Sequence, residues 1–396
     1  MSTPDAEELC AGLARMLAEE GALTDPAWRA AFEAVPRHVF VPGFYLRSAQ
    51  DAGGLPVWKP VTEKTDPERW LTSAYADQTL ITQLDGEEED WQNPRVRNGG
   101  VFTSSSTLPS LVARMWHDAD IADGHTVLEI GTGTGYSTAL ACHRLGSDHV
   151  TSIEVDGPRL RQAHRALEQC GYAPRLAEAD GTCGYWPSAP YDRIVLACSM
   201  RRLPAPLVSQ STVGGKLLVP LSGWLHASAR ALLTTTGQGR AEGPLLPGTI
   251  SFMLARVHAP PRFGNPNHWA ALAVHAPARP TAHAPERIAG ASVDTFHTAF
   301  LAQCAVPHAQ EITMGRTVHL IDAVSGSVAL LEPDNGGGWV VRQAGPVALW
   351  DRVEEVLEAY DAAGRPPPEE FTLTVTPQIQ VLEHPGMPAL CLPGPP

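Results

Sequence analysis

The feature that most constrains the fold of this chain is a glycine-rich stretch near its middle, at residues 127–136, which reads VLEIGTGTGY. An apolar run leads into Gly131, Gly133 and Gly135, and a helical pattern follows. Glycines at alternating positions let the backbone turn tightly and approach a ligand that a Cβ atom would exclude. The stretch therefore predicts a strand, a loop and a helix. The GxGxG pattern alone fits a plain strand-to-helix turn as well as a nucleotide-type site.

Strand and helix patterns alternate around this stretch, from residue 126 to residue 221. Short apolar runs with several β-branched residues are separated by helical patterns that close at Gly146, Gly171 and Gly214. Such alternation predicts an α/β fold with a mostly parallel, doubly wound sheet, whose ligand site lies beyond the carboxyl ends of the strands. The predicted strands are 126–130, 149–154, 175–179, 192–197 and 216–221, and the predicted helices are 136–145, 158–170 and 204–211.

Three acidic residues stand at the ends of three successive predicted strands. Glu129 lies just before the loop, where a carboxylate suits a cationic sulfonium or amino group better than a pyrophosphate. Glu154 ends the next strand and can accept both ribose hydroxyls, and Asp180, followed by Gly181, can accept a hydrogen bond from an adenine amine. These acids favour an adenosine with a cationic tail, as in S-adenosylmethionine, and leave NAD as the alternative cofactor.

The length of 396 residues predicts two domains, because single hydrophobic cores rarely grow beyond about 250–300 residues. An amphipathic helix is predicted at residues 5–19, and a long irregular segment from Pro36 to Pro109. After residue 258 the chain becomes rich in proline and alanine, and strand patterns with one helix pattern follow. We predict a cofactor-binding domain with N-terminal helical and substrate segments at 1–258, a linker at 259–289 and a smaller C-terminal α+β domain at 290–396.

Composition and charge exclude several classes of function. A formal net charge of −14, without a basic stripe, argues against a nucleic-acid partner. No apolar stretch approaches the roughly 20 residues that span a bilayer, and the acidic N-terminal segment does not fit a signal peptide. We therefore expect a cytoplasmic protein without membrane association. Seven scattered cysteines, with no CxxC pair and no His/Cys cluster, predict buried thiols and no metal site.

A series of short motifs occurs in the first half of the chain. It begins with VPRHVFVP at 35–42, passes through the glycine loop and closes with GGKLLVP at 214–220. Over roughly residues 30–222, the motifs and their order resemble the protein-L-isoaspartate O-methyltransferase family. The other matching segments are AYAD at 74–77, SSTLP at 105–109, IE at 153–154, GY at 171–172, DG at 180–181 and APYD at 189–192.

The resemblance implies a Rossmann-like class I methyltransferase that uses S-adenosylmethionine and acts on a carboxylate in a peptide or protein. Thr107 stands at the family's active-site serine position and is expected to face the substrate with its neighbour Ser106. Asp77 matches an acid of the family's substrate-side segment. The expected cofactor contacts are Glu129, Gly131, Thr132, Gly133, Gly135, Tyr136, Glu154, Val155, Asp180 and Gly181.

The chain departs from the family pattern on the substrate side. An insertion runs through Gly100, Leu108 replaces a glutamine, and residues 197–199 read ACS where the family has TAA. With the C-terminal domain, these changes resemble an actinobacterial branch that works with ribosomally made, modified peptides such as lanthipeptides and graspetides. The expected function is esterification of an aspartate side chain in a modified macrocyclic peptide. The ester then collapses to an aspartimide, which hydrolyses to isoaspartate.

Other interpretations stay open at the level of sequence. The chain could be a general isoaspartate repair methyltransferase, or a non-catalytic protein that binds peptides in a cofactor-dependent way. Thr107 could instead cap the helix that starts near Pro109, and Asp77 could lie in a surface turn. The acidic run from Asp85 to Asp90 is typical of a solvated loop, although it could attract a basic substrate segment. The oligomeric state is not predicted.

Overall fold

The computed structural model describes residues 6–248, 251–289 and 293–394. The chain divides into two compact units. Unit 1 comprises Met1–Ala197 and Ser209–Leu218, and unit 2 comprises Cys198–Val208 and Val219–Pro396. Neither unit is one continuous stretch of chain, so this division differs from the domain boundary predicted near residue 258.

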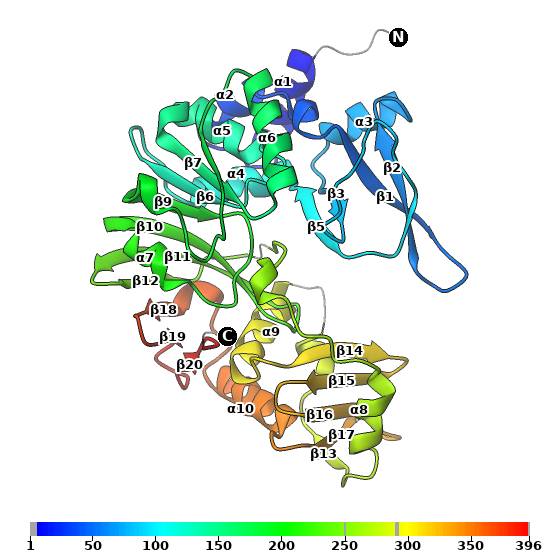
Figure 1. Cartoon of the computed structure of the whole chain (residues 1–396). Coiled ribbons are helices and arrows are strands. Elements are labelled where there is room, and N and C mark those ends of the chain that lie inside the picture. The colour runs from blue at the N-terminus through cyan, green and yellow to red at the C-terminus, as the bar shows by residue number, and fades with distance from the viewer. Residues whose placement is uncertain (1–5, 249–250, 290–292, 395–396) are drawn as a thin grey trace. The chain divides into compact units, whose positions relative to one another are not determined.

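Five parallel strands form the central sheet of unit 1, in the order β10-β9-β6-β7-β8 (Figure 1). Branched side chains such as Val127, Ile153 and Ile194 are buried, as expected for parallel strands with both faces covered. The predicted alternation of strands and helices is confirmed. The elements are β6 (Val127–Ile130), β7 (Val150–Glu154), β8 (Arg175–Glu178), β9 (Tyr191–Leu196), β10 (Ser211–Ser222), α4 (Pro109–Asp118), α5 (Tyr136–Leu145) and α6 (Gly157–Gln169). The short helix α7 (Ala205–Ser209) belongs to unit 2 except for its last residue.

The sheet as a whole is mixed, so the prediction of a mostly parallel sheet is corrected. β10 belongs to unit 1 up to Leu218 and to unit 2 from Val219, and further strands of unit 2 follow it in the strand order. These strands pair antiparallel, and one pairing joins Ala241 to Val375. Local sequence patterns do not reveal partners so far apart in the chain. The strands are β11 (Ser228–Gly237), β12 (Arg240–Pro244), β18 (Thr372–Val375), β19 (Gln380–Glu383) and β20 (Leu390–Cys391).

Residues 43–106, predicted as part of a long irregular segment, form a second sheet in unit 1. Its order is β4-β2-β1-β3-β5, and its strand pairs are antiparallel. Phe44 and Trp70 lie in its apolar core. Pro56 and Pro60 stand within β2 itself, which hid the strand pattern from sequence reasoning. The elements are β1 (Gly43–Gln50), β2 (Pro56–Thr62), α3 (Pro67–Ala74), β3 (Leu80–Leu84), β4 (Arg97–Asn98) and β5 (Phe102–Ser106).

The N-terminal helices of unit 1 are held by apolar and aromatic contacts. The predicted first helix is confirmed as α1, which buries Cys10, Leu13 and Leu17. Trp28 of α2 stacks on Trp116 of α4 with ring centroids 5.3 Å apart. The VPRHVFVP segment follows α2 directly and contains a short 3-10 helix, η1. These elements are α1 (Ala6–Glu19), α2 (Pro26–Ala34) and η1 (Arg37–Phe40).

Unit 2 contains an antiparallel sheet with the order β13-β17-β16-β15-β14. Ala273 of α8 is buried against Ile321, Val328 and Leu330 of this sheet. Residues 259–289, predicted as a linker, therefore contribute a packed helix and an edge strand to the unit. The elements are η4 (Arg256–His258), α8 (Pro266–Ala273), β13 (Arg279–Thr281), η5 (Pro285–Arg287), α9 (Val293–Ala305), β14 (Gln310–Met314), β15 (Thr317–Asp322), β16 (Ser327–Pro333), β17 (Trp339–Ala344), α10 (Leu349–Ala362) and η6 (Pro368–Glu370).

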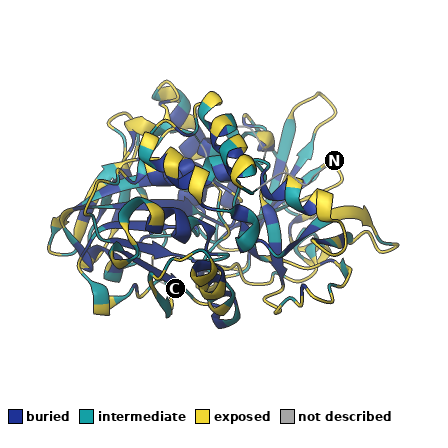
Figure 2. Cartoon of the chain, turned by 90° about the horizontal axis from the view of Figure 1, so that it is seen from above, coloured by how far each residue is buried: buried dark blue, intermediate teal, exposed yellow. Residues whose placement is uncertain are grey.

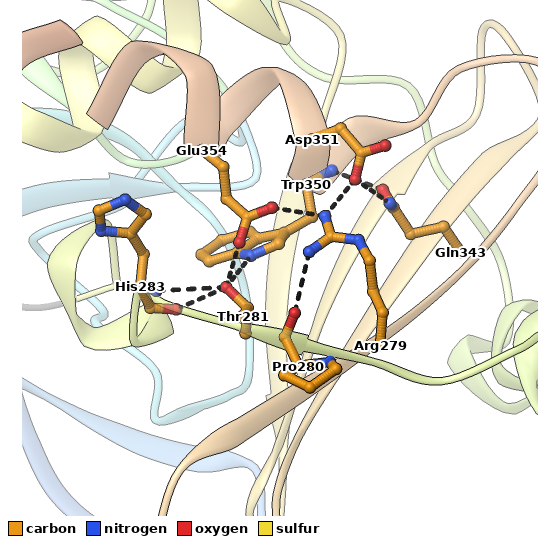
Figure 3. Close-up of polar contacts among 8 residues, drawn as sticks. All are labelled: Arg279, Pro280, Thr281, His283, Gln343, Trp350, Asp351 and Glu354. Carbon is orange, nitrogen blue, oxygen red and sulfur yellow. Dashed lines mark hydrogen bonds and ion pairs between the residues drawn. The ribbon is translucent and has the colours of Figure 1, made fainter. Parts of the chain in front are cut away.

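Polar side chains join β13 to α10 within unit 2, as Figure 3 shows. The Arg279 guanidinium donates hydrogen bonds to the carboxylates of Asp351 and Glu354. The Thr281 hydroxyl donates to Glu354 and accepts a hydrogen bond from Trp350 Nε1 at 2.8 Å. The strand is thus held by side-chain contacts as well as by its pairing with β17.

Buried residues concentrate on the strands, and exposed residues lie on outer helix faces and loops (Figure 2). None of the described helices has both the length and the apolar character that crossing a membrane requires. Over residues 6–248, 251–289 and 293–394, no group of three or more His, Cys, Asp or Glu side chains is placed to hold a metal ion.

Candidate active site

The glycine loop turns the chain from β6 into α5. The backbone N–H groups of Gly131 and Thr132 both donate to the carbonyl of Ile153 in β7, at 2.9 and 3.2 Å. Gly135 is the N-cap of α5 with φ 89°, and a Cβ there would lie 3.1 Å from Cβ of Ala163. Glycine suits both this left-handed backbone and this close approach. The predicted strand, loop and helix are confirmed.

Glu154 is the last residue of β7, and Asp180 lies two residues beyond the end of the neighbouring strand, β8. The Glu154 carboxylate accepts hydrogen bonds from the backbone N–H of Gly133 at 2.9 Å and of Asp156 at 3.1 Å. Asp180 is exposed, and its Oδ1 accepts from the N–H and the hydroxyl of Thr182. A carboxylate has about four acceptor positions, so both groups can also take hydrogen bonds from hydroxyl and amine groups of an adenosine.

Glu129 precedes the glycine loop by two residues, and its side chain is fully buried. Its Oε2 accepts hydrogen bonds from the hydroxyls of Thr138 at 2.5 Å and Ser152 at 2.8 Å. Burial raises the pKa of this carboxyl, and hydrogen bonds from the hydroxyls of Ser137, Thr138 and Ser152 act against that rise. Its Oε1 is buried and accepts no hydrogen bond of normal geometry from a described residue. A buried polar atom without a partner is costly, and a cationic ligand group at the loop would offset that cost.

The remaining predicted cofactor residues differ in their environments. Thr132 is buried, and its hydroxyl shares a hydrogen bond with that of Ser152 at 2.7 Å. Tyr136 is also buried, with its ring 6.1 Å from that of Phe32, so its side chain points into the core and only its backbone lies at the loop. Val155 is 48% exposed beside Glu154, and Gly181 is half-exposed beside Asp180.

Arg37, which sequence reasoning did not single out, organises the substrate-side segments. It is fully buried, and burial lowers the pKa of its guanidinium to about 10, so the group stays cationic at neutral pH. The one sequence feature that indicates this role is the position of an arginine within the apolar segment 35–42. The guanidinium donates hydrogen bonds at 3.0–3.3 Å to the carbonyls of Ala74, Ala76, Gln78, Ser106 and Thr107 and to the hydroxyl of Ser106.

The three predicted substrate-side residues have different surroundings. Ser106 is buried, with its hydroxyl held by Arg37, whereas the side chain of Thr107 is half-buried. Asp77 Oδ1 accepts a hydrogen bond from the backbone N–H of Ser110 at 2.8 Å, in the first turn of α4. The residue at the N-cap of α4 makes no side-chain cap. Asp77 therefore caps α4 from outside the helix, and the side chain of Thr107 does not serve as its cap.

Contacts within unit 1 bring the substrate-side sheet to the glycine loop. Gln83 of β3 donates through Nε2 to Asp156 Oδ2 at 3.1 Å, and its Oε1 accepts from the Thr103 hydroxyl at 2.9 Å. A Cβ on Gly133 would lie 3.9 Å from the carbonyl oxygen of Ser105. β5, which carries the hydroxyl tract, therefore passes directly beside the loop.

The acidic run is exposed apart from the half-buried Glu89, as a solvated loop would be, and ion pairs tie it to the rest of the chain. Arg97 contacts three of its carboxylates, those of Asp85 at 3.2 Å, Glu87 at 3.0 Å and Glu89 at 3.5 Å. Tyr45 donates its hydroxyl to Glu89 at 2.6 Å. These contacts tie the insertion to β1 and β4.

Sequence comparisons identify similar proteins. A family model described as "Protein-L-isoaspartate(D-aspartate) O-methyltransferase" matches residues 67–234. The protein-L-isoaspartate O-methyltransferase of Gloeobacter violaceus (strain ATCC 29082 / PCC 7421) is 31% identical over 219 residues, covering 55% of this chain and 85% of that protein. The protein of the same name from Thermococcus onnurineus (strain NA1) is 40% identical over 120 residues, covering 30% of this chain and 54% of that relative.

A solved structure of a protein-L-isoaspartate O-methyltransferase shares the fold, with a TM-score of 0.53 at 20% sequence identity. The match covers 95% of this chain and 99% of the other. At this level of identity, the likeness shows a shared fold.

Proposed function

Because this chain belongs to the protein-L-isoaspartate O-methyltransferase family of S-adenosylmethionine-dependent enzymes, we propose that it esterifies the carboxylate of an isoaspartyl residue in a peptide or protein. The observation that carries the proposal is the passage of β5 beside the glycine loop, with the Ser105 carbonyl 3.9 Å from a Cβ position on Gly133. This closeness supports a single site for the proposed cofactor residues and the substrate-side hydroxyls.

The residues at the strand ends fit the cofactor. Glu154 would accept the ribose hydroxyls, and Asp180 would accept from the adenine amine. The glycine backbone at 131–135 leaves room for close approach. Oε1 of Glu129, two residues before the loop, accepts no hydrogen bond of normal geometry from a described residue, and a cationic ligand group there would offset the cost of its burial. When bound, S-adenosylmethionine supplies an electrophilic methyl carbon on a sulfonium.

Positioning of the substrate is the main task of this chain's own residues. A carboxyl group with an ordinary pKa near 4 is already ionised at neutral pH, so no general base is needed. Its oxygen would form the new bond to the methyl carbon, and the electron pair of the broken carbon–sulfur bond would stay on sulfur. The half-buried hydroxyls of Ser105 and Thr107 can hold the carboxylate in line. Arg37 acts as a positioning residue, because it fixes the carbonyls of Ser106 and Thr107.

A second candidate substrate is an aspartate in a modified, macrocyclic peptide. The altered substrate side favours it: Thr107 and Leu108 replace the family's residues, and the insertion at 85–100 adds a structured wall to the second sheet. After esterification, the following backbone amide nitrogen would attack the ester carbonyl and close a five-membered imide. The methoxy group would leave with the amide proton as methanol.

The test uses the full chain with S-adenosylmethionine and two synthetic peptides that differ only in an isoaspartyl or an aspartyl residue. Mass spectrometry should detect a mass gain of one methylene on the isoaspartyl peptide alone. Glu154→Ala serves as the control for cofactor dependence. Cofactor binding by calorimetry without any ester on the isoaspartyl peptide would refute the proposal.

A third peptide, cyclised through its side chains and containing Asp-Gly, distinguishes the candidates. Methyl transfer to this peptide, with none to the linear isoaspartyl peptide, would favour the second candidate. Binding of cofactor and peptides without transfer to any of them would favour a non-catalytic peptide-binding protein.

A further inference from the structure

An exposed apolar surface stands at the start of β5. We call it the β5 patch and define it by Leu55, Val96, Val101 and Phe102, which are 52, 56, 70 and 42% exposed. A Cβ on Gly99 would lie 3.5 Å from Cδ1 of Leu55, which places the turn between β1 and β2 beside the insertion. Clustered exposed apolar side chains, as opposed to single ones, are typical of interaction sites.

The patch is held in place by hydrogen bonds and ring contacts. Asp85 donates its backbone N–H to the carbonyl of Val101 at 2.8 Å, and its Oδ1 accepts from the Val101 N–H at 2.8 Å. The ring of Phe102 meets that of Trp58 edge-on, with centroids 5.2 Å apart. Val101 is therefore kept exposed by a fixed backbone.

β5 connects the patch to the glycine loop. It is the last strand in the order of its sheet, so one side of its backbone has no strand partner there. Side chains two apart in a strand share a face, and Thr103, Ser105 and Thr107 are half-buried while Ser104 and Ser106 are buried. The pairing of β5 with β3 is irregular between Ser104 and Phe102. Val101 is itself 70% exposed, and it lies four residues before Ser105, about 13 Å away at a rise of about 3.3 Å per residue.

We propose that the β5 patch is a specificity site for the peptide substrate: an extended peptide adds to the free edge of β5 and packs an apolar side chain, four residues from the esterified residue, on Val101. An added strand has the same rise as β5, so four residues span the distance from Ser105 to Val101. This inference rests on the proposed methyl transfer and adds the recognition of sequence around the acceptor.

Charge next to the patch limits which residue the peptide can present. The carboxylates of Asp85 and Glu87 are 40 and 64% exposed and share Arg97 with Glu89. Three carboxylates around one guanidinium leave an excess of negative charge. An acidic residue of the peptide should therefore be disfavoured at this position more strongly than a neutral polar one.

The test compares isoaspartyl peptides with Leu, Ser or Asp at the fourth residue before or the fourth residue after the isoaspartyl residue. For the wild type, the effect is expected either before or after the isoaspartyl residue. On that side, replacing Leu by Ser should raise KM about 10-fold with kcat unchanged, and replacing Leu by Asp should raise KM further. Val101→Ser should reduce the Leu-to-Ser preference to about 3-fold or less. Val213→Ser is the matched control, because Val213 is 77% exposed on β10, and it should keep the full preference.

Fluorescence anisotropy with labelled versions of these peptides measures recognition independently of methyl transfer. Methyl transfer with equal KM for Leu and Ser on both sides would overturn the inference and leave the proposed function standing. So would a Val101→Ser variant with a normal melting temperature and an undiminished preference. A Leu preference in binding without any methylated product would support the patch and refute the proposed function.

Discussion

Replacing Arg37 by leucine tests how the substrate-side segments are held. The Arg37 guanidinium is fully buried and bonds to two chain segments, at residues 74–78 and 106–107. Leucine removes every donor while keeping most of the apolar stem. The carbonyls of Ala74 and Ser106 are buried, so water does not replace the lost donor, whereas the other three carbonyls lie nearer to solvent.

The expected loss of stability in Arg37→Leu follows from these two buried carbonyls. A buried acceptor left without a donor costs about 1–3 kcal/mol, so two of them cost about 2–6 kcal/mol. Removing the buried cation offsets a part of this, because a desolvated charge is itself unfavourable. We expect a loss of about 3 kcal/mol, which corresponds to a melting temperature lower by about 6–12 °C in a unit of this size.

Arg37→Lys tests whether the loss of stability scales with the number of donors. An ammonium has three donors where the guanidinium has five, so Arg37→Lys should lose about half as much stability. Arg165→Leu is the control, since Arg165 is exposed on α6 and the change should stay within about 0.5 kcal/mol.

Calorimetry and urea denaturation followed by tryptophan fluorescence measure the loss, and initial rates of methyl transfer measure its effect on the site. At a temperature where Arg37→Lys remains folded, kcat/KM should still fall about 10-fold or more, because small displacements of Ser106 and Thr107 misplace the carboxylate. An Arg37→Leu variant that loses less than about 1 kcal/mol would refute the reasoning. So would a lysine variant as unstable as the leucine one.

Three further predictions concern the acids of the site. Burial raises the pKa of Glu129 in the folded protein, so this carboxyl contributes to stability below its ordinary pKa, and that contribution is lost as the pH rises through the raised pKa. Glu129→Gln should therefore flatten this part of the pH profile of stability measured by urea denaturation. An unchanged profile would contradict the prediction. Glu154→Ala should weaken cofactor binding about 10–100-fold in calorimetry, and a change below about 3-fold would exclude the ribose contact. Asp77→Ala should lower the free energy of unfolding by about 1 kcal/mol through the lost cap. Asp77→Asn should keep the stability of the wild type and a kcat within about 2-fold of it. A loss of kcat in Asp77→Asn beyond about 100-fold would instead assign the carboxylate to catalysis.

The glycine loop and the order of strands around it were predictable because their signals are local. The positive φ of Gly135 and its approach to Ala163 require glycine. Glu154 and Asp180 follow strands whose apolar runs are plain in the sequence. Parallel strands end at one edge, so the nearness of these acids to the loop followed from topology.

The orientation of side chains was less predictable. Glu129 precedes the loop by only two residues, yet its side chain lies in the interior with Thr138 and Ser152, since neighbouring residues in a strand face opposite ways. Tyr136 begins α5, and its ring turns toward Phe32, a partner about a hundred positions away in the chain. Spacing along the sequence does not encode such contacts.

The second sheet and the role of Arg37 were missed for a related reason. β2 contains two prolines and β4 has two residues, so neither shows a strand pattern by itself. Their pairing becomes favourable only when the whole sheet forms. The role of Arg37 appears only once five carbonyls from two distant segments surround its guanidinium.

The division of β10 between the two units has a consequence for how this protein can vary. The chain leaves unit 1 after Ala197, returns at Ser209 and leaves again after Leu218. No single cut separates the units without removing part of one of them. Exchange of a whole unit by recombination would need matched breakpoints on both sides of residues 209–218. Heritable change in this protein is therefore expected mainly as point substitutions and loop insertions, with both units passed on together.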